Sequence, residues 1–139
     1  MAWLVICGRS GASFFGFANT DAGCTLTYEG DTFCFALGEE KISFAVDAAE
    51  GEWKHYMLTL DAAAREVRFV CDFENVQTKK LSDVWTFAGF TSMNIAQNAA
   101  GDNAVHLSCV LDEFLVFDGT LTSDTVCSLA AYYRNGVSK

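Results

Sequence analysis

The sequence predicts an all-β fold: a two-sheet antiparallel β-sandwich, or jelly roll, with one short C-terminal helix. The chain of 139 residues has no proline and eleven glycines, so its turns must be built on Gly, Asn and Asp. Short alternating or apolar segments recur between such turn signals, which is typical of strands. Helical spacing of apolar residues is convincing only near the C-terminus.

The predicted strands follow one another between short polar connections. They cover residues 3–7, 13–18, 24–28, 32–37, 41–46, 53–60, 66–73, 84–90 and 105–117. Turn signals lie at residues 19–23, 29–31, 38–40, 48–51 and 61–64. The seventh segment shows the period most clearly, because every second residue is apolar and should face the core: Val67, Phe69, Cys71 and Phe73. The residues between them should lie on a partly wet face.

One helix is predicted after the last strand. Thr122 can cap its first turn with the side-chain hydroxyl, and Asn135 with Gly136 can end it. One helix face is apolar at the right spacing and should pack on an edge of the sandwich; it comprises Val126, Leu129, Ala130 and Tyr133.

Composition and charge exclude several classes of protein. With 51% hydrophobic and 19% charged residues, the chain fits one globular domain over residues 1–139 and neither a disordered chain nor a coiled coil. Its net charge of −9 repels phosphate backbones and anionic lipids, so no nucleic-acid partner is expected. The apolar run at residues 2–7 is too short for a signal peptide or a membrane span, so we expect neither.

The six cysteines leave two interpretations open. They could form three disulfides in an exported domain, or they could be buried thiols that act as small hydrophobic residues. No C-x-x-C pair occurs, so the spacing matches no zinc module. Cys71 and Cys109 lie inside apolar strand patterns, which favours thiols at those two positions.

Two stretches share the pattern of one known domain family. Residues 53–61 (WKHYMLTLD) and the strand at 67–72 are similar to the family's W-H-H-V-A-L-T-Y-D strand and its partner. Residues 111–118 (LDEFLVFD), with 121–122 and 126–129, are similar to its I-D-E-V-R-I-Y-N strand and final helix. The chain thus resembles a LamG-like jelly roll of the concanavalin A-like lectin/glucanase superfamily. The resemblance implies that Trp53 lies in the core.

The sequence departs from the family pattern in two ways. An Asp-Gly turn of the family is replaced by Asp72-Phe73, so we expect a different geometry for the next hairpin. The chain is also short for the family. Either it is a compact variant that lacks a first strand, or it is a piece of a longer protein, for which the resemblance favours an extracellular or cell-surface location.

Catalytic arrangements are poorly supported. Hydrolases of the superfamily carry carboxylates at alternate positions of one strand, whereas the only such spacing, at residues 29–31, contains a glycine and indicates a turn. Asp112 and Glu113 are adjacent and should point to opposite faces, with one carboxylate accepting hydrogen bonds from loop amides. His55 and His106 are the only histidines, and no nucleophile motif accompanies them. We therefore expect no enzyme activity.

Carbohydrate binding is the leading function because of the resemblance. A pyranose needs an exposed aromatic ring for stacking and amides or carboxylates for its hydroxyls. The candidate sugar-binding residues are Trp85, Asn94, Gln97, Asn98 and Asn103, in and before an amide-rich stretch. The competing interpretation is a core position for Trp85 followed by an ordinary polar loop.

Calcium is the cofactor that the resemblance implies, because relatives place carboxylates and backbone carbonyls at a loop on the sandwich rim. The candidate ligands are Asp72, Glu74 and Asp102. A solvated acidic rim is the competing interpretation, since no calcium-loop spacing occurs. The expected function is thus a non-catalytic recognition module with a glycan or a protein as ligand. The alternatives are a structural or protein-interaction module of a larger assembly, and a glycan-active hydrolase whose carboxylates converge from separate strands.

Overall fold

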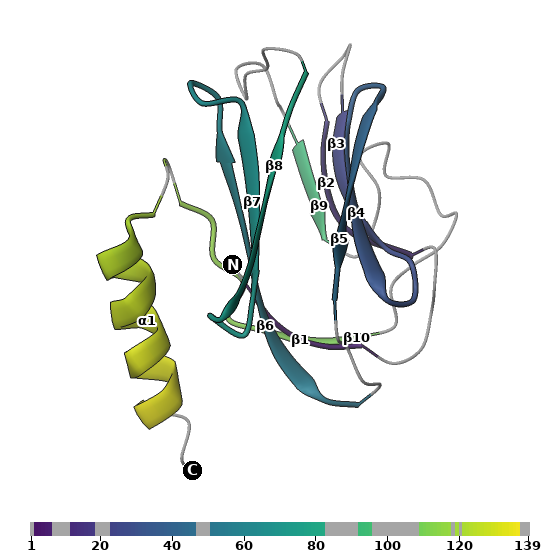
Figure 1. Ribbon diagram of the computed structural model, residues 1–139. Helices are drawn as coiled ribbons and strands as arrows, with labels where there is room; N and C mark the ends of the chain where they lie inside the picture. The colour runs from purple at the N-terminus through teal and green to yellow at the C-terminus, as the bar shows by residue number, and fades with distance from the viewer. Residues whose placement is uncertain are drawn as a thin grey trace.

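The computed structural model describes residues 2–6, 12–18, 23–46, 51–82, 92–95, 109–117, 119 and 121–136. Within them the elements are β1 (Ala2–Ile6), β2 (Ala12–Ala18), β3 (Gly23–Tyr28), β4 (Thr32–Leu37), β5 (Glu40–Ala45), β6 (Trp53–Asp61), β7 (Glu66–Cys71), β8 (Asn75–Lys80), β9 (Ser92–Ile95), β10 (Cys109–Asp112) and α1 (Ser123–Gly136). The strands form two antiparallel sheets that face each other as layers (Figure 1). The predicted β-sandwich with one short helix is confirmed.

Each sheet joins strands from both halves of the chain. Sheet A has the strand order β10-β1-β6-β7-β8, and sheet B has the order β5-β4-β3-β2-β9. In sheet A, β1 lies between β6 and β10, while in sheet B the late strand β9 pairs with β2. The helix α1 lies on the side of sheet A that faces away from sheet B (Figure 1). No helix in the described part of the chain is long and apolar enough to span a membrane.

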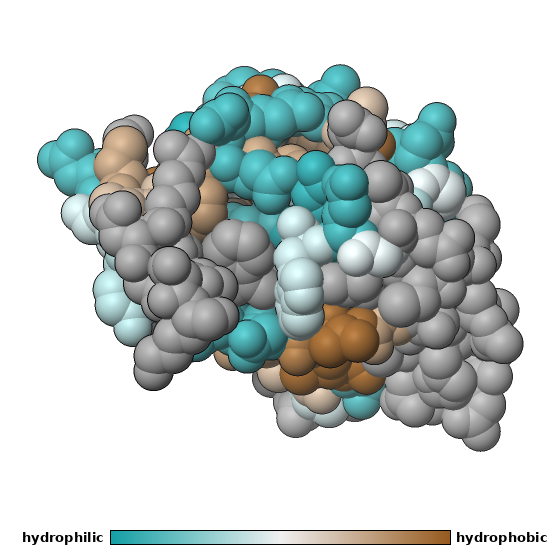
Figure 2. Space-filling model, turned by 90° about the horizontal axis from the view of Figure 1, so that it is seen from below, coloured by the Kyte–Doolittle hydropathy of each residue, from teal (hydrophilic) through white to brown (hydrophobic). Residues whose placement is uncertain are grey.

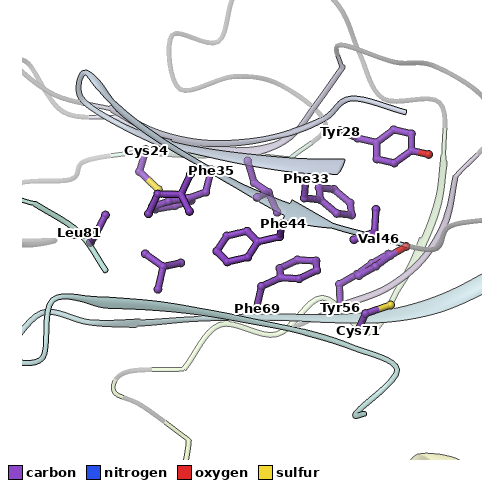
Figure 3. Packing of buried hydrophobic residues seen from close by; sticks show 13 residues of the cluster. Cys24, Tyr28, Phe33, Phe35, Phe44, Val46, Tyr56, Phe69, Cys71 and Leu81 are labelled. Carbon is purple, nitrogen blue, oxygen red and sulfur yellow. The ribbon is translucent and has the colours of Figure 1, made fainter. Parts of the chain in front are cut away.

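The core between the sheets is built mainly from aromatic rings (Figure 3). Phe33 and Phe44 of sheet B are fully buried and meet Tyr56 and Phe69 of sheet A. The Phe44 and Phe69 rings stack with centroids 5.1 Å apart, and Phe33 meets Tyr56 edge-on at 4.9 Å. Such ring pairs each contribute about 0.5–1.5 kcal/mol beyond the burial of their area.

The alternation predicted for the seventh segment is confirmed over most of its length. Val67, Phe69 and Cys71 of β7 all belong to the core cluster. Val70, expected on a partly wet face, is instead only 1% exposed, and its partner Met57 on β6 is 3% exposed. Both residues alternate with core-facing neighbours and so face away from the core. The outer face of sheet A is therefore shielded from solvent at these two positions.

The end of the seventh segment differs from the expectation. Asp72 and Phe73 both have positive φ, 51° and 63°, and the Glu74 N–H donates to the Cys71 carbonyl at 3.2 Å. These φ signs are those that an Asp-Gly hairpin turn favours, but the register pairs Cys71 with Asn75 and leaves three residues in the loop. The predicted change of hairpin geometry relative to the family stays a prediction. Phe73 also does not enter the core, because this turn directs its ring onto His55.

The sequence pattern misses two strands. The strand β8 (NVQTKK) is an edge strand whose side chains are exposed except that of Gln77, which is half-buried, so it shows no apolar alternation. The strand β9 lies in the amide-rich stretch that was expected to be a loop. Of the last predicted strand, residues 109–112 are confirmed as β10, while 113–117 are not strand. The strand predicted at residues 84–90 lies outside the described residues.

The helix starts as predicted. The Thr122 hydroxyl oxygen accepts a hydrogen bond from the Thr125 N–H at 3.2 Å, which satisfies one of the unpaired amides of the first turn. Ala130 is buried, and Val126 and Leu129 are half-buried, so this face packs against the molecule. The side chain of Tyr133 lies outside the described set.

Side-chain hydrogen bonds join the edges of the two sheets. The Gln77 Oε1 on β8 accepts from the Ala45 N–H on β5 at 3.1 Å, and the Gln77 Nε2 donates to the Ala45 carbonyl at 2.6 Å. Further along the same edges, the Glu40 carboxylate accepts from the Ser82 N–H at 2.9 Å. The β5 and β8 edges are thus held together by side-chain hydrogen bonds to backbone.

None of the cysteines in the described part of the chain forms a disulfide; these are Cys24, Cys34, Cys71, Cys109 and Cys127. Cys24 and Cys71 are buried, in line with the expectation of thiols that act as small hydrophobic residues. Burial raises the pKa of the Cys24 thiol to about 12, so this thiol is protonated at neutral pH.

Candidate functional site

One of the predicted sugar-binding residues can be placed. Asn94 is half-buried in β9 and pairs with Gly16 of β2, which in turn pairs with Thr25 of β3. Thr25 alternates with the core residues Cys24 and Leu26, so Asn94 lies on the face of sheet B that points away from the core. The other predicted residues, Trp85, Gln97, Asn98 and Asn103, lie outside the described residues.

Of the predicted calcium ligands, Asp72 and Glu74 lie in the β7–β8 turn, and Asp102 is outside the described residues. Both carboxylate oxygens of Asp72 are engaged. Oδ1 accepts from the His55 N–H at 2.9 Å, and Oδ2 lies 3.2 Å from the Lys54 Nζ. Among the residues that the structure describes, no three His, Cys, Asp or Glu side chains are grouped to hold a metal ion. The calcium site stays a prediction.

The acidic pairs considered for catalysis have structural roles. Residues 29–31 form the predicted turn, in which Gly30 has a φ of 77° and the Glu29 N–H donates to the Thr32 carbonyl at 2.8 Å. The Asp112 Oδ1 accepts from the Glu113 N–H at 2.9 Å, so one carboxylate does accept a loop amide, as expected. Both pairs are exposed.

Trp53 does not lie in the core, which is where the family resemblance implied that it would be. It begins β6, and its side chain is 50% exposed rather than buried in the core. Tyr56 of the same strand belongs to the core cluster and Leu58 packs against it, so alternation turns Trp53 to the outer face of sheet A. The alternation of β6 in the sequence already predicts an outward-facing Trp53, in contrast to the core position that the resemblance implied. An exposed tryptophan is the feature that sugar stacking requires.

His55 and Phe73 lie beside Trp53 on that outer face. His55 is fully buried, and the Phe73 ring stacks on the imidazole with centroids 3.8 Å apart and planes 15° apart. Burial, together with the positive charge of the N-terminal ammonium, lowers the pKa of His55 to about 4, an effect that the nearby Asp72 carboxylate partly opposes. The imidazole is therefore neutral at physiological pH and provides a flat support for Phe73.

Three charged side chains form a group of ion pairs at the start of β6 and in the β7–β8 turn. The Lys54 Nζ lies 3.2 Å from the Asp72 Oδ2 and 3.7 Å from the Glu52 Oε2. The Lys54 side chain is 19% exposed, against 61% for Glu52 and 43% for Asp72. The pKa of Lys54 is raised, chiefly by the hydrogen bond of its ammonium to Asp72. The two carboxylates of this group are therefore more exposed to solvent than the Lys54 side chain that they pair with.

These side chains are called the Trp53 rim, which comprises Glu52, Trp53, Lys54, Asp72 and Phe73, with His55 below. They come from the start of β6 and the β7–β8 turn, which lie toward the same end of the sandwich (Figure 1). Seen from that end, the described surface carries hydrophilic residues and, apart from most of them, a hydrophobic patch (Figure 2). The rim offers an aromatic surface and hydrogen-bond acceptors, and its imidazole is too deeply buried to act on a ligand.

The comparisons agree with the fold. No curated protein matches the chain. A family model described as the concanavalin A-like lectin/glucanases superfamily matches residues 2–127. Because this match covers most of the chain, the protein belongs to the concanavalin A-like lectin/glucanase superfamily.

Proposed function

We propose that the protein is a non-catalytic recognition module that binds carbohydrate at the Trp53 rim. Members of the superfamily often bind carbohydrate or proteins, and LamG-like domains are generally non-catalytic binding modules. The observation that carries the proposal is the side chain of Trp53, which is half-exposed on the outer face of sheet A.

The chemistry of the Trp53 rim suits a sugar. The C–H groups on one face of a pyranose pack against an indole ring, and its hydroxyls donate hydrogen bonds to carboxylate oxygens. Asp72 is fixed by hydrogen bonds through its N–H and Oδ1 to the backbone of His55, and by the Lys54 ammonium. The acceptor oxygens are therefore largely preorganised, which lowers the entropy lost on binding.

The test is a glycan array followed by titration of the best ligand with wild type, Trp53→Phe and Trp53→Ala. We expect Trp53→Ala to weaken binding at least about tenfold, as truncation of a central aromatic contact does, and Trp53→Phe to retain part of the affinity. The control is Tyr132→Ala, which removes an aromatic ring of 69% exposure on α1. Equal loss in this control, or no loss in Trp53→Ala, contradicts the proposed site.

Repeating the array in a calcium chelator tests the predicted cofactor. Binding that survives the chelator is expected if Trp53 and the fixed carboxylates suffice. Binding that is lost in chelator and restored by calcium supports the metal site predicted at Asp72, Glu74 and Asp102.

A protein ligand is the second candidate, favoured by exposed apolar side chains. Val5 of β1 pairs with both Trp53 and Val110, so these two exposed residues share the outer face of sheet A. Val116 and Phe117, which follow β10, are 62% and 42% exposed. An array without any glycan hit, combined with self-association or partner capture that Val110→Ser abolishes, would favour this candidate.

A further inference from the structure

We propose that the sugar site at Trp53 extends across β1 to a second contact point at Val110 and Asp112 on β10, so that its ligand is a neutral, linear oligosaccharide in an extended conformation rather than a single terminal sugar. This inference rests on the proposed function, because it names the class of carbohydrate that the same site takes and the residues that hold its further units.

The outer face of sheet A carries a row of three positions on neighbouring strands. Val5 of β1 pairs with Trp53 of β6 on one side and with Val110 of β10 on the other. Residues that pair directly across strands share a face of the sheet, so Val110 lies on the outer face like Trp53. The three strands run side by side (Figure 1). These three positions are called the outer row.

The spacing of the outer row suits an extended sugar chain. Neighbouring strands are about 4.8 Å apart, so Trp53 and Val110 are separated by about 9.6 Å. One pyranose in an extended, β-linked chain has about the length of one strand spacing, so three linked units reach from Trp53 to Val110. An α-linked chain of the same sugar curls and does not follow a straight row.

Both ends of the outer row are open to solvent. Trp53 is 50% exposed and Val110 is 54% exposed. The indole can stack on the C–H groups of one sugar ring, and the valine methyl groups can contact those of another.

The outer row has only three positions. On one side β7 ends at Cys71, which pairs with Tyr56 and not with Trp53. On the other side β10 is the edge of sheet A within the described part of the chain. The gain in affinity with the length of the sugar chain should therefore end at the third unit.

Asp112 provides a hydrogen-bond acceptor beside the Val110 end of the outer row. It lies two residues further along β10, so it shares the outer face with Val110 and is about 7 Å from it. Asp112 is exposed, and its Oδ1 accepts from the Glu113 N–H at 2.9 Å. The carboxylate has further capacity to accept hydrogen bonds from the hydroxyl groups along the edge of a sugar chain.

Charges of both signs lie near the outer row, which favours a neutral ligand. Trp3 of β1 pairs with both His55 and Asp112, so the imidazole and the carboxylate belong to the next row along the strands. The N-terminal ammonium is close enough to His55 to contribute to its lowered pKa. An acidic sugar is repelled by the Asp112 carboxylate and an amino sugar by the ammonium, whereas hydroxyl groups are repelled by neither.

The experiment compares glucose oligomers that differ only in linkage: the β-linked cello series and the α-linked malto series, each from one to five units. Binding is measured by calorimetry. We expect the cello trisaccharide to bind at least about tenfold more tightly than the malto trisaccharide, because only the extended chain contacts both Trp53 and Val110. In the cello series the affinity should rise up to the third unit and then change by less than about twofold.

Val110→Ala tests the far end of the outer row. It should weaken binding of the cello trisaccharide about two- to fivefold and leave binding of the cello disaccharide unchanged. The matched control is Val76→Ala, which truncates a valine of 45% exposure on β8. Val76 pairs with Val70 and so lies on the same outer face but away from the row. The control should bind the trisaccharide like wild type.

Asp112→Asn tests the acceptor at the β10 edge. The amide oxygen can still accept from the Glu113 N–H, but one carboxylate oxygen is replaced by a donor. We expect about two- to tenfold weaker binding of the cello trisaccharide. The control is Glu39→Gln, which changes an exposed carboxylate in the β4–β5 turn of sheet B and should have no effect. Wild-type affinity in Asp112→Asn contradicts the placement of the chain over β10.

The failures are distinguishable. If neither series binds and the glycan array is also empty, the proposed function itself fails. If the two series bind equally in a Trp53-dependent way, or if affinity stops rising after the first unit, the extended-chain inference is overturned and the proposed function stands. If the array identifies other ligands, neutral linear chains of three or more units support the inference, whereas single terminal, branched or charged sugars overturn it.

Discussion

At the scale of single residues, the buried His55 makes the stability of the folded protein sensitive to acid. Its pKa is lowered from 6.5 to about 4, chiefly by burial and also by the N-terminal ammonium, so the folded protein resists a proton that the unfolded chain accepts below pH 6.5. The contribution to stability is therefore complete above pH 6.5 and is lost as the pH falls to about 4. The loss amounts to about 3 kcal/mol in the free energy of unfolding.

Urea unfolding of wild type and His55→Phe across this pH range tests the effect. Phenylalanine can preserve the stack on Phe73 but cannot titrate, so the variant should lose about 3 kcal/mol less than wild type between pH 7 and pH 4. Parallel pH profiles for the two proteins would show that His55 is not the group responsible.

The sequence prediction was wrong for Trp53 and for Phe73, for opposite reasons. Trp53 was assigned to the core by resemblance, although its strand parity with His55 puts it on the outer face. Phe73 was assigned to the core by parity, although the strand ends at Cys71 and a left-handed turn redirects the ring. A side chain at the end of a strand is governed by the turn, and the alternation rule does not extend to it.

At the scale of elements, the strands that carry core residues were predictable and the edge strands were less so. The segment β3 to β7 was found within one or two residues of its bounds, because its inward residues are apolar. The strand β8 was missed because an edge strand needs few apolar residues and packs chiefly through its backbone partner β7. The candidate site was predicted only in part, because the sequence singled out Asp72 as a candidate ligand, whereas the exposure of Trp53 became known from the structure.

Gln77 should account for much of the contact between β8 and β5. Gln77→Ala removes two hydrogen bonds to Ala45. The backbone N–H and carbonyl of Ala45 then lose these partners. We expect a loss of about 1–3 kcal/mol in the free energy of unfolding.

Denaturant unfolding measures this cost, and Thr78→Ala on the same strand, whose side chain is exposed, is the control. The control should change the free energy of unfolding by less than about 0.5 kcal/mol. Equal effects of the two substitutions would mean that the Gln77 bonds add nothing to stability.

At the scale of the whole molecule, we expect stability and the proposed ligand binding to depend on different aromatic residues. Phe69 is fully buried and contacts the rings of Phe33, Phe44 and Tyr56, so Phe69→Ala should cost about 3–5 kcal/mol. Trp53→Ala should cost less than about 1 kcal/mol, because half of the indole is already in water. Thermal unfolding monitored by circular dichroism compares the two variants, and a Trp53→Ala loss as large as that of Phe69→Ala would return Trp53 to the core.

The bonds between Gln77 and Ala45 also bear on how the molecule avoids sticking to itself. Unpaired N–H and C=O groups on an edge strand form a template to which a strand of another molecule can add, and this is a common route to aggregation. At Ala45 both groups are already taken by one side chain from the facing sheet. A single glutamine on β8 thus occupies part of the β5 edge, in a chain that has no proline to interrupt its strands.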